Sequence, residues 1–299
     1  VYSELEGCKL VGLVDLIGER AGELANKYNT TPYTDFSALF GEVDAVSVVT
    51  PPSSHYTIAR AFLAEGINVL VDKPMTRTMA EADELVRLAK ENNLVLQVGH
   101  IERFNSAVQK LKDIVDNPIF IESHRLGPQA PQVMMEIGVV LDLMIHDIDI
   151  VLDLVNSEIK RVNSTGLSVE TPYEDIATAQ VRFANGCIAN FTASRLSIEK
   201  KRSLEVTQKD SYISLDFRNQ NIEISRYVDD PSAEDDPFSR KVISERPYLS
   251  REEPLKLELA HFIDCVTYNK KPLVSGEEGR RALKVALQVL EGIRREYEV

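Results

Sequence analysis

The sequence predicts an α/β protein in which a doubly wound parallel sheet is followed by an α+β domain with an open, mostly antiparallel sheet. Apolar strands alternate with helical segments as far as about residue 102, the pattern of a parallel sheet covered by helices. From about residue 176, strand pairs joined by short turns replace that pattern. The chain has 299 residues, 43% of them hydrophobic, which suffices for one large or two moderate domains.

The first part of the chain contains four near-continuous apolar runs, as expected for strands buried on both faces. These strands are predicted at 9–15, 43–50, 67–74 and 94–100. Segments of helical composition follow the first three strands, at 18–28, 55–66 and 79–93. Thr78 and Glu81 form a T-x-x-E capping box where the third helix should begin. We therefore expect three successive strand–helix units and a fourth strand.

The second part of the chain has a different pattern. Helices are predicted at 103–117 and at 138–156, with a strand between them. Asn185-Gly186 predicts a two-residue hairpin turn, and a second hairpin is expected around residues 218–221. These hairpins indicate an antiparallel sheet.

The end of the chain returns to helices. Residues 228–254 are acidic and carry four prolines, which predicts a loop or linker. Two final helices are expected, the last of them opened by a capping box of Ser275 and Glu278. We place the domain boundary after residue 102, between domains 1–102 and 103–299.

Composition excludes several classes of protein. The net charge is −13 and the pI about 5.0, so most of the surface should repel a phosphate backbone, and nucleic acid is not an expected partner. No apolar run approaches the roughly 20 residues of a membrane span, and the N-terminus lacks signal-peptide features, so we expect a cytoplasmic protein without membrane contact. Cys8, Cys187 and Cys265 are far apart and odd in number, which favours small core residues over disulfides or a zinc site.

The ends of the predicted strands are candidate ligand-binding positions. In a doubly wound sheet, ligands bind outside the carboxyl ends of the strands. The residues at these ends are Asp15, then Thr50, Pro51, Pro52 and His55, then Asp72, Lys73 and Pro74, and finally Gly99 and His100. We expect them to converge on one edge, although strands also end in polar residues for purely structural reasons.

Asp15 occupies the strand end where a dinucleotide-binding fold places an acid for the adenosine ribose. An acid there favours NAD, because it would repel the 2′-phosphate of NADP. The alternative is a strand-terminal Asp that only caps a turn. The glycine-rich fingerprint of such folds is not in the sequence, and we expect it in a strand and turn immediately upstream of Val1.

The predicted helix 138–156 carries a second group of candidates. At about 100° per residue, its apolar side chains collect on one packing face, made of Leu141, Met144, Ile145, Ile148, Val151, Leu152 and Val155. A second face collects Asp142, His146, Asp149 and Asp153. Asp142 and His146 are four residues apart, so the carboxylate can orient the imidazole of a general base. The alternatives are a solvated acidic face and, less favoured, a metal site of Asp142, His146 and Asp149.

Three stretches together resemble a known family. VVTPPSSHYTIARAFLAEGINVLVDKP, then VGHIERFN, then GVVLDLMIHDID closely resemble the glucose-fructose oxidoreductase and inositol dehydrogenase (Gfo/Idh/MocA) family of NAD(P)-dependent sugar and cyclitol dehydrogenases. The resemblance spans nearly the whole chain. It implies a Rossmann-type dinucleotide-binding domain at 1–102 and a substrate-binding and oligomerisation domain at 103–299.

The resemblance also implies residue roles. The family's Glu-Lys-Pro signature falls on Asp72, Lys73 and Pro74, which makes Lys73 the catalytic lysine. His146 would take the hydroxyl proton, Asp142 would hold the substrate or the histidine, and hydride would pass to the nicotinamide. The implied cofactor-binding residues are Asp15, Thr50, Pro51, Pro52, His55, Asp72, Lys73 and Pro74. The implied substrate-binding residues are Lys73, His100, Arg103, Asn105, Asp142 and His146.

Two departures from the family pattern stand out. Asp72 replaces the usual Glu, and the glycines that commonly crowd the start of the Asp/His helix are reduced to Gly138. The stretch IERFN and the helix look most like members that oxidise the 3-hydroxyl of an N-acetylglucosamine diphosphonucleotide. The candidates for its diphosphate are Arg103, Arg125 and Arg195, each of which could equally be an ion-pair residue.

Other functions stay open. A cyclitol or polyol dehydrogenase would use the same residues, and a non-catalytic NAD-binding sensor or scaffold would share the fold. An open sheet with helices on one side leaves its other face to be buried, so we expect a homodimer or homotetramer.

Overall fold

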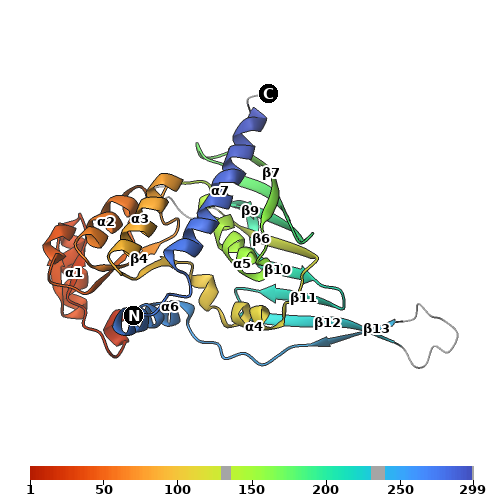
Figure 1. Ribbon diagram of the computed structural model, residues 1–299, viewed down its shortest axis with the longest axis horizontal. Helices are drawn as coiled ribbons and strands as arrows, with labels where there is room; N and C mark the ends of the chain where they lie inside the picture. Colours follow the sequence, from red (N-terminus) through yellow and green to blue (C-terminus); the bar gives the residue numbers. More distant parts are fainter. Residues whose placement is uncertain (129–135, 230–239, 298–299) are drawn as a thin grey trace. The chain divides into compact units, whose positions relative to one another are not determined.

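The chain divides into two compact units. A computed structural model describes residues 1–128, 136–229 and 240–297 (Figure 1). The first unit comprises Val1–Ile101 and Glu253–Arg280, and the second comprises Glu102–Glu252 and Arg281–Val299. The sequence-based boundary placed everything after residue 102 in the second domain, whereas Glu253–Arg280 packs with the first unit.

The first unit is a parallel α/β structure, as predicted. Its strands are β1 (Gly12–Val14), β2 (Thr31–Tyr33), β3 (Ala45–Val48), β4 (Asn68–Asp72) and β5 (Leu96–Gly99). Its helices are α1 (Gly18–Tyr28), α2 (Pro52–Ala64), α3 (Met79–Glu91) and α6 (Pro254–Tyr268), with short 3-10 turns η1 (Tyr2–Glu4) and η2 (Phe36–Leu39). The strands form two separate parallel sheets, β1-β2 and β3-β4-β5. Strand β2 was not predicted, because its three residues, TPY, carry no periodic signal.

Burial explains how the first unit is assembled. Strand β5 is buried along its whole length, and β4 at its three central residues. Helix α6 covers part of this sheet with Leu259, Phe262 and Cys265, which pack with Leu70 and Val95. This contact explains why a segment distant in sequence belongs to the first unit. The predicted capping box of α3 is confirmed, with both of its reciprocal hydrogen bonds present.

The second unit is built on an eight-stranded sheet. Its strands are β6 (Phe120–Pro128), β7 (Ile159–Leu167), β8 (Ile176–Phe183), β9 (Ile188–Ser194), β10 (Leu196–Thr207), β11 (Ser211–Asp216), β12 (Asn221–Asp229) and β13 (Arg240–Glu245). The order is β13-β12-β11-β10-β6-β9-β8-β7, and every neighbouring pair is antiparallel except β6 and β9. The predicted open, mostly antiparallel sheet is therefore confirmed.

Helices cover one face of this sheet (Figure 1). They are η3 (Ile101–Phe104, which begins in the first unit), α4 (Ser106–Ile114), the π-helical turn η4 (Val140–Met144), α5 (Ile145–Val155) and the long α7 (Gly276–Tyr297), whose first turns lie in the first unit. The inner face of β8 buries Ala177, Ala179 and Val181, while its outer face exposes Thr178 and Gln180. The sheet thus has one apolar, helix-covered face and one polar face.

Two local predictions were wrong. The hairpin between β8 and β9 has a three-residue turn, since Phe183 pairs with Cys187, and only Gly186 in it has a positive φ, of 95°. This is a turn with a left-handed glycine at its end instead of the predicted two-residue turn. The segment 228–254 is not all loop, because Arg240–Glu245 forms β13, which pairs with β12. Residues 230–239 of that segment lie outside the described residues.

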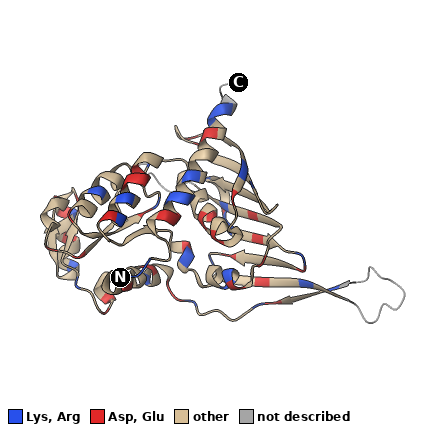
Figure 2. Cartoon of the chain, in the orientation of Figure 1, with Lys and Arg blue, Asp and Glu red and all other residues tan. Residues whose placement is uncertain are grey.

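Figure 2 shows acidic and basic residues interspersed along the helices of both units. Among the described helices, none combines the length and the apolar composition that crossing a bilayer requires. All three cysteines are free thiols; Cys187 and Cys265 are buried, and Cys8 is half-buried.

Candidate active site

His55 ties together the loops that follow β3 and β4. The residue lies in α2 and is 1% exposed. Its Nδ1 lies 2.9 Å from the carbonyl oxygen of Pro74, and its Nε2 lies 2.7 Å from that of Thr50. Both ring nitrogens therefore face main-chain carbonyl oxygens, and the N–H of the imidazole can donate to one of them. The ring lies between two of the predicted strand-end segments.

Lys73 leaves the end of β4 in a turn that the neighbouring side chains define. Its main-chain N–H donates to Asp72 Oδ1 at 2.8 Å, and the Lys73–Pro74 peptide bond is cis. Gly99 at the end of β5 permits this arrangement, since a Cβ there would come within 2.9 Å of Asp72 Oδ1. Asp72 and Lys73 are half-buried, and Pro74 is buried. The short side chain of Asp72 can accept this hydrogen bond from the next residue, and it thereby defines the turn that carries Lys73.

Asp15 stands at the end of β1 as predicted. Its Oδ1 accepts from the main-chain N–H of Ile17 at 2.8 Å, and its Oδ2 pairs with Arg20 at 3.2 Å. Apolar side chains beside the ends of β1 and β3 are exposed, with Leu16 at 92% and Val49 at 70%. An acceptor for ribose hydroxyls next to exposed apolar surface fits the adenosine part of a dinucleotide.

His100 follows β5 and is 1% exposed. Its main-chain N–H donates to the carbonyl oxygen of Val98 at 2.8 Å. The predicted role of His100 in substrate binding stays a prediction.

The predicted Asp/His helix forms, but its first turn is a π-helix. The main-chain N–H of Ile145 reaches back to the carbonyl oxygen of Val140, five residues earlier, and ordinary α-helix follows. Asp142 lies in the π-helical turn, and His146 lies in the first turn of α5. Both residues are half-buried. All seven residues of the predicted packing face are buried, but Asp147, Asp149 and Ile150 are buried too, so α5 is enclosed on more than one side.

Gly138 is explained by a contact that the sequence did not reveal. A Cβ on Gly138 would lie 2.1 Å from the carboxyl group of Glu174, whose Oε1 also accepts from the main-chain N–H of Val140 at 3.1 Å. Burial raises the pKa of Glu174. The carboxyl group therefore caps the helix start, and only glycine leaves room for it.

The three arginines considered for a diphosphate are all buried and paired within the second unit. Arg103 is 5% exposed and lies 3.1 Å from Asp153 and 3.7 Å from Asp149. Arg195 is 5% exposed; its Nη2 donates to the carbonyl oxygen of Ile137 at 3.0 Å, and its Nε lies 3.8 Å from Asp175. The predicted polar face of the helix is correspondingly not all solvated, because Asp149 is only 3% exposed.

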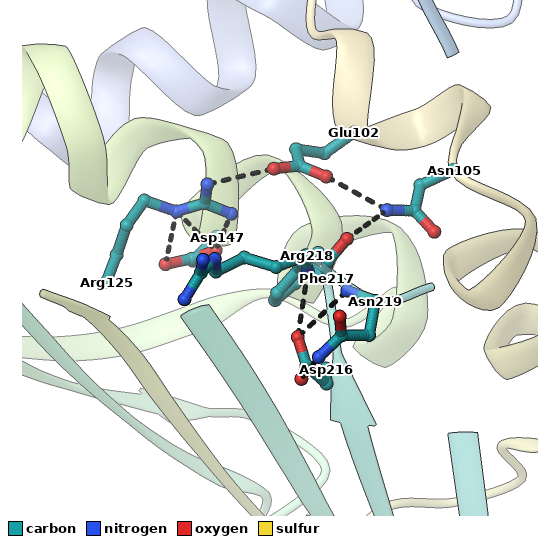
Figure 3. Close-up of polar contacts among 8 residues, drawn as sticks. All are labelled: Glu102, Asn105, Arg125, Asp147, Asp216, Phe217, Arg218 and Asn219. Carbon is teal, nitrogen blue, oxygen red and sulfur yellow. Dashed lines mark hydrogen bonds and ion pairs between the residues drawn. The ribbon is translucent and has the colours of Figure 1, made fainter. Parts of the chain in front are cut away.

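Arg125 is the centre of a buried network (Figure 3). Its Nε and Nη2 contact the carboxylate of Asp147 at 2.7 to 3.1 Å, and its Nη1 donates to Glu102 at 2.9 Å. Its guanidinium also lies over the ring of Phe217, 4.9 Å from the centroid. Burial opposes the charge, but Asp147 and Glu102 outweigh that effect and raise the pKa of Arg125. The network fixes α5 at Asp147, the residue directly after His146.

Asn105, another predicted substrate-binding residue, belongs to the same network. Its Oδ1 caps α4 by accepting from the N–H of Ala107 at 3.0 Å, and its Nδ2 donates to the carbonyl oxygen of Phe217 at 3.1 Å. It is 2% exposed, so the amide is used within the second unit.

The predicted site residues therefore fall into two groups. The first unit holds Asp15, Thr50, Pro51, Pro52, His55, Asp72, Lys73, Pro74 and His100. Arg103, Asn105, Asp142 and His146 lie in the second unit. The sequence analysis missed Glu102, Asp147 and Glu174. For Asp147 a signal was available, because an acidic residue within an apolar helix indicates that a buried cation faces that helix. In the parts of the chain that the structure describes, no group of three or more His, Cys, Asp or Glu side chains is arranged to hold a metal.

A parallel α/β unit joined to a helix-covered antiparallel sheet is the architecture of a two-domain dinucleotide-binding oxidoreductase. Comparison with known proteins gives the same class. Residues 1–100 match the model of an oxidoreductase family with an NAD-binding Rossmann fold, and residues 121–213 match the GFO/IDH/MocA C-terminal domain.

Individual relatives agree with this result. The chain is 36% identical, over 94% of its length and 88% of the relative, to the UDP-N-acetylglucosamine 3-dehydrogenase of Acidithiobacillus ferrooxidans. It is 27% identical, over 98% of its length and 89% of the relative, to the scyllo-inositol 2-dehydrogenase (NAD(+)) of Bacillus subtilis. A solved structure of the Acidithiobacillus enzyme superposes with a TM-score of 0.87, at 35% identity, covering 95% of this chain and 89% of that one. The chain belongs to the GFO/IDH/MocA oxidoreductase family.

Proposed function

We propose that the protein is an NAD-dependent dehydrogenase that oxidises a ring secondary alcohol of a nucleotide sugar, with UDP-N-acetylglucosamine as the first substrate to test. The observation that carries the proposal is the 36% identity to a UDP-N-acetylglucosamine 3-dehydrogenase over 94% of the chain. Lys73, Asp142 and His146 stand at the positions where the family motifs place a lysine, an aspartate and a histidine.

The proposed chemistry divides the work between two side chains acting on one hydroxyl group. A ring nitrogen of His146 takes the hydroxyl proton as general base. The Nζ ammonium of Lys73 donates a hydrogen bond to the same oxygen and stabilises its developing negative charge. Asp142, in the preceding turn, accepts from the substrate or orients the imidazole. The nicotinamide cofactor, when bound, accepts the hydride.

For the cofactor we propose NAD over NADP. Asp15 would accept hydrogen bonds from the adenosine ribose, and Thr50, Pro51 and Pro52 would line the neighbouring strand end. A carboxylate at Asp15 repels a 2′-phosphate. The Asp15→Ser variant should therefore narrow the preference for NAD over NADP, measured as the ratio of the two kcat/KM values; an unchanged ratio would contradict this role.

A spectrophotometric assay tests the main proposal. The protein is mixed with NAD and, in parallel, with UDP-N-acetylglucosamine, free N-acetylglucosamine and scyllo-inositol, and formation of NADH is followed. Turnover is expected with the nucleotide sugar. Lys73→Ala should lower kcat by about 10²- to 10⁴-fold, the range for loss of a positioned proton-transfer or charge-stabilising group. Lys90→Ala, which removes an exposed lysine from the last turn of α3, is the control.

The second candidate is a cyclitol dehydrogenase, favoured by the 27% identity to a scyllo-inositol 2-dehydrogenase over 98% of the chain. Turnover of scyllo-inositol without turnover of the nucleotide sugar would select it. NADH binding with no turnover of any alcohol in the panel would favour a non-catalytic sensor instead. Full activity of Lys73→Ala would refute the assigned role of the lysine.

We further propose a homodimer or homotetramer that buries the polar outer face of the eight-stranded sheet. Exposed Thr178, Gln180 and Arg182 on β8 would lie in this interface. Sedimentation equilibrium tests the proposal, and a monomer at micromolar concentration would contradict it. Three free thiols suit a reducing compartment, so we propose the cytoplasm as the location.

A further inference from the structure

Arg202 faces another arginine across the sheet of the second unit. In the ladder between β6 and β10, Arg202 lies directly opposite Arg125. Directly opposed residues of antiparallel strands place their side chains on the same face of the sheet. Arg125 contacts Asp147 of α5, so this is the helix-covered face. Arg202 therefore leaves β10 on that face, beside a charge of its own sign.

The two arginines differ in their partners. Arg125 is 2% exposed and is neutralised by Asp147 and Glu102. Arg202 is exposed, and within residues 1–128, 136–229 and 240–297 its guanidinium has no carboxylate partner. Partial burial, followed by the charge of Arg125, lowers the pKa of Arg202. The charges of Glu102 and Asp147 oppose this lowering, so Arg202 is an exposed cation next to a neutralised arginine.

Arg218 brings a second cation to the same place. It lies in the turn between β11 and β12, where Asp216 Oδ1 accepts from the main-chain N–H groups of Arg218 at 2.8 Å and Asn219 at 3.2 Å. The Nη1 of Arg218 donates to the carbonyl oxygen of Lys200 on β10 at 3.1 Å. Figure 3 shows its side chain extending from the turn toward Arg125 and Asp147. The charge of Arg218 acts on Arg202 in the same sense as that of Arg125.

We propose that Arg202 and Arg218 form the subsite for the diphosphate of a nucleotide-sugar substrate. The inference rests on the proposed function and names the residues that would recognise the anionic part of that substrate. Guanidinium groups match phosphate oxygens with paired N–H donors, and a diphosphate offers enough oxygens for both. The Nη1 of Arg218 donates to the carbonyl oxygen of Lys200, and among the described residues no other side-chain hydrogen bond of Arg218 is found, so its other donors can meet an anion.

The subsite is tied to the proposed catalytic helix. Arg125, the strand neighbour of Arg202, holds Asp147 at 2.7 Å, and Asp147 directly follows His146 in α5. An anion bound at Arg202 would therefore lie beside the network that positions the proposed general base. The three arginines considered from the sequence are buried in ion pairs, and Arg202 and Arg218 take over the role assigned to them.

The diphosphate bound at this subsite could also be that of the cofactor, because NAD carries a diphosphate as well. We assign the subsite to the substrate, since Arg202 and Arg218 belong to the second unit and the strand ends of the dinucleotide-binding fold belong to the first. The two sources predict different results. A substrate subsite affects the binding of UDP and leaves the binding of NADH unchanged, whereas a cofactor subsite does the reverse.

Calorimetric titration of the full chain with UDP tests the inference. The variants are Arg202→Gln and Arg218→Gln. Each should weaken the Kd for UDP by about 10- to 100-fold, as expected for loss of one charged hydrogen-bonding group. The Kd for NADH should change less than about 2-fold, and thermal unfolding of Arg202→Gln should show little change in stability, because the side chain is exposed.

Lys201→Gln is the matched control. Lys201 is the adjacent residue of β10, is exposed, and pairs with Leu126, so its side chain lies on the opposite face of the sheet. Its removal takes away the same charge and should leave the Kd for UDP within about 2-fold. An equal loss of affinity for UDP in Lys201→Gln and Arg202→Gln would show that only the net charge of the protein matters, and it would overturn the inference.

The outcomes also separate this inference from the proposed function. If the wild-type protein oxidises UDP-N-acetylglucosamine and Arg202→Gln and Arg218→Gln keep the wild-type KM, the function stands and the subsite is wrong. If no alcohol is oxidised but UDP binds and Arg202→Gln abolishes that binding, the subsite stands and the dehydrogenase function is wrong. Failure of UDP to bind the wild-type protein overturns the subsite outright.

Discussion

The two units hold buried carboxyl groups in opposite ways. In the second unit, Asp175 is 0% exposed, and its carboxylate accepts from the main-chain N–H groups of Val169, Glu170 and Thr171 at 2.7 to 3.0 Å. Burial opposes its charge, but the Thr171 hydroxyl and these N–H groups lower its pKa to about 2. In the first unit, Glu258 is 3% exposed, and burial, followed by the charge of Asp72, raises its pKa to about 8.

Both residues are shielded from solvent, and they differ in the hydrogen-bond donors and the charges around them. Among the described residues, Glu258 Oε1 has no hydrogen-bond partner. Asp147 and Asp149 of α5 instead face arginines. His146, the proposed general base, therefore lies on a helix that buried ion pairs hold in place. The loop of Lys73 is held instead by hydrogen bonds between side chains and the main chain, from Asp72 and His55. The predictions below test this contrast, beginning with the largest expected effect.

Asp147→Ala should destabilise the protein most. It leaves Arg125 buried with only Glu102 as a counter-charge, and loss of one partner of a buried pair costs about 3–5 kcal/mol. The free energy of unfolding in urea measures it. The matched control is Asp15→Ala, which breaks an ion pair whose side chains are 60% and 27% exposed and should cost below about 1 kcal/mol. Equal losses in the two variants would remove the distinction between the units.

Glu258→Gln should change how stability depends on pH. The carboxyl group titrates at 4.5 in the unfolded chain and at about 8 in the folded protein, so the folded state binds more protons between these values. The free energy of unfolding of the wild-type protein should therefore fall by on the order of 5 kcal/mol as pH rises through this window. The variant has no titrating group there and should lack this fall. A slope identical in both proteins would show that Glu258 is ionised in the folded state at neutral pH.

His55→Ala should have a moderate effect on stability and a larger one on turnover. It removes the contacts to the carbonyl oxygens of Thr50 and Pro74, at a cost of about 1–3 kcal/mol for buried acceptors left unsatisfied. Because Pro74 follows Lys73, kcat should fall while the Kd for UDP stays unchanged. Lys90→Ala, on the exposed surface of α3, is the control and should stay within about 0.5 kcal/mol. Wild-type kcat in His55→Ala would show that the bridge does not position the lysine.

Thr78→Ala should produce the smallest effect. It removes the side-chain acceptor from the capping box of α3, which is worth about 1 kcal/mol. Glu81→Gln keeps a side-chain oxygen that can accept from the main-chain N–H of Thr78, so it should lower the free energy of unfolding by only a few tenths of the loss in Thr78→Ala. Thermal unfolding of the two variants measures the difference, and a larger loss in Glu81→Gln would contradict the capping assignment.

Several features were predictable because they depend on local patterns. Short stretches of neighbouring residues determine the apolar strands β3, β4 and β5 and the capping box of α3. The structure contains these elements where they were expected. The seven apolar residues predicted to pack within 141–155 are also buried, although burial extends to Asp147 and Asp149.

Other features depend on partners far away in the sequence. Arg125 and Asp147 are 22 residues apart, and Gly138 is explained only by Glu174. β13 was missed because a proline-rich, acidic segment carries no strand signal, and its pairing with β12 decides its conformation. Sequence periodicity reports which side of an element is apolar, and it does not report which buried charges will meet.

The π-helical turn Val140–Met144 has a consequence for insertions and deletions. Such a turn accommodates one residue more than an ordinary helical turn, and the helix on either side keeps its direction. Deleting a single residue from this turn would convert it into an ordinary α-helical turn, and the helical segments on either side would keep their relative orientation. The same deletion further along α5 would rotate Asp142 and His146 together by about 100° relative to the rest of the helix.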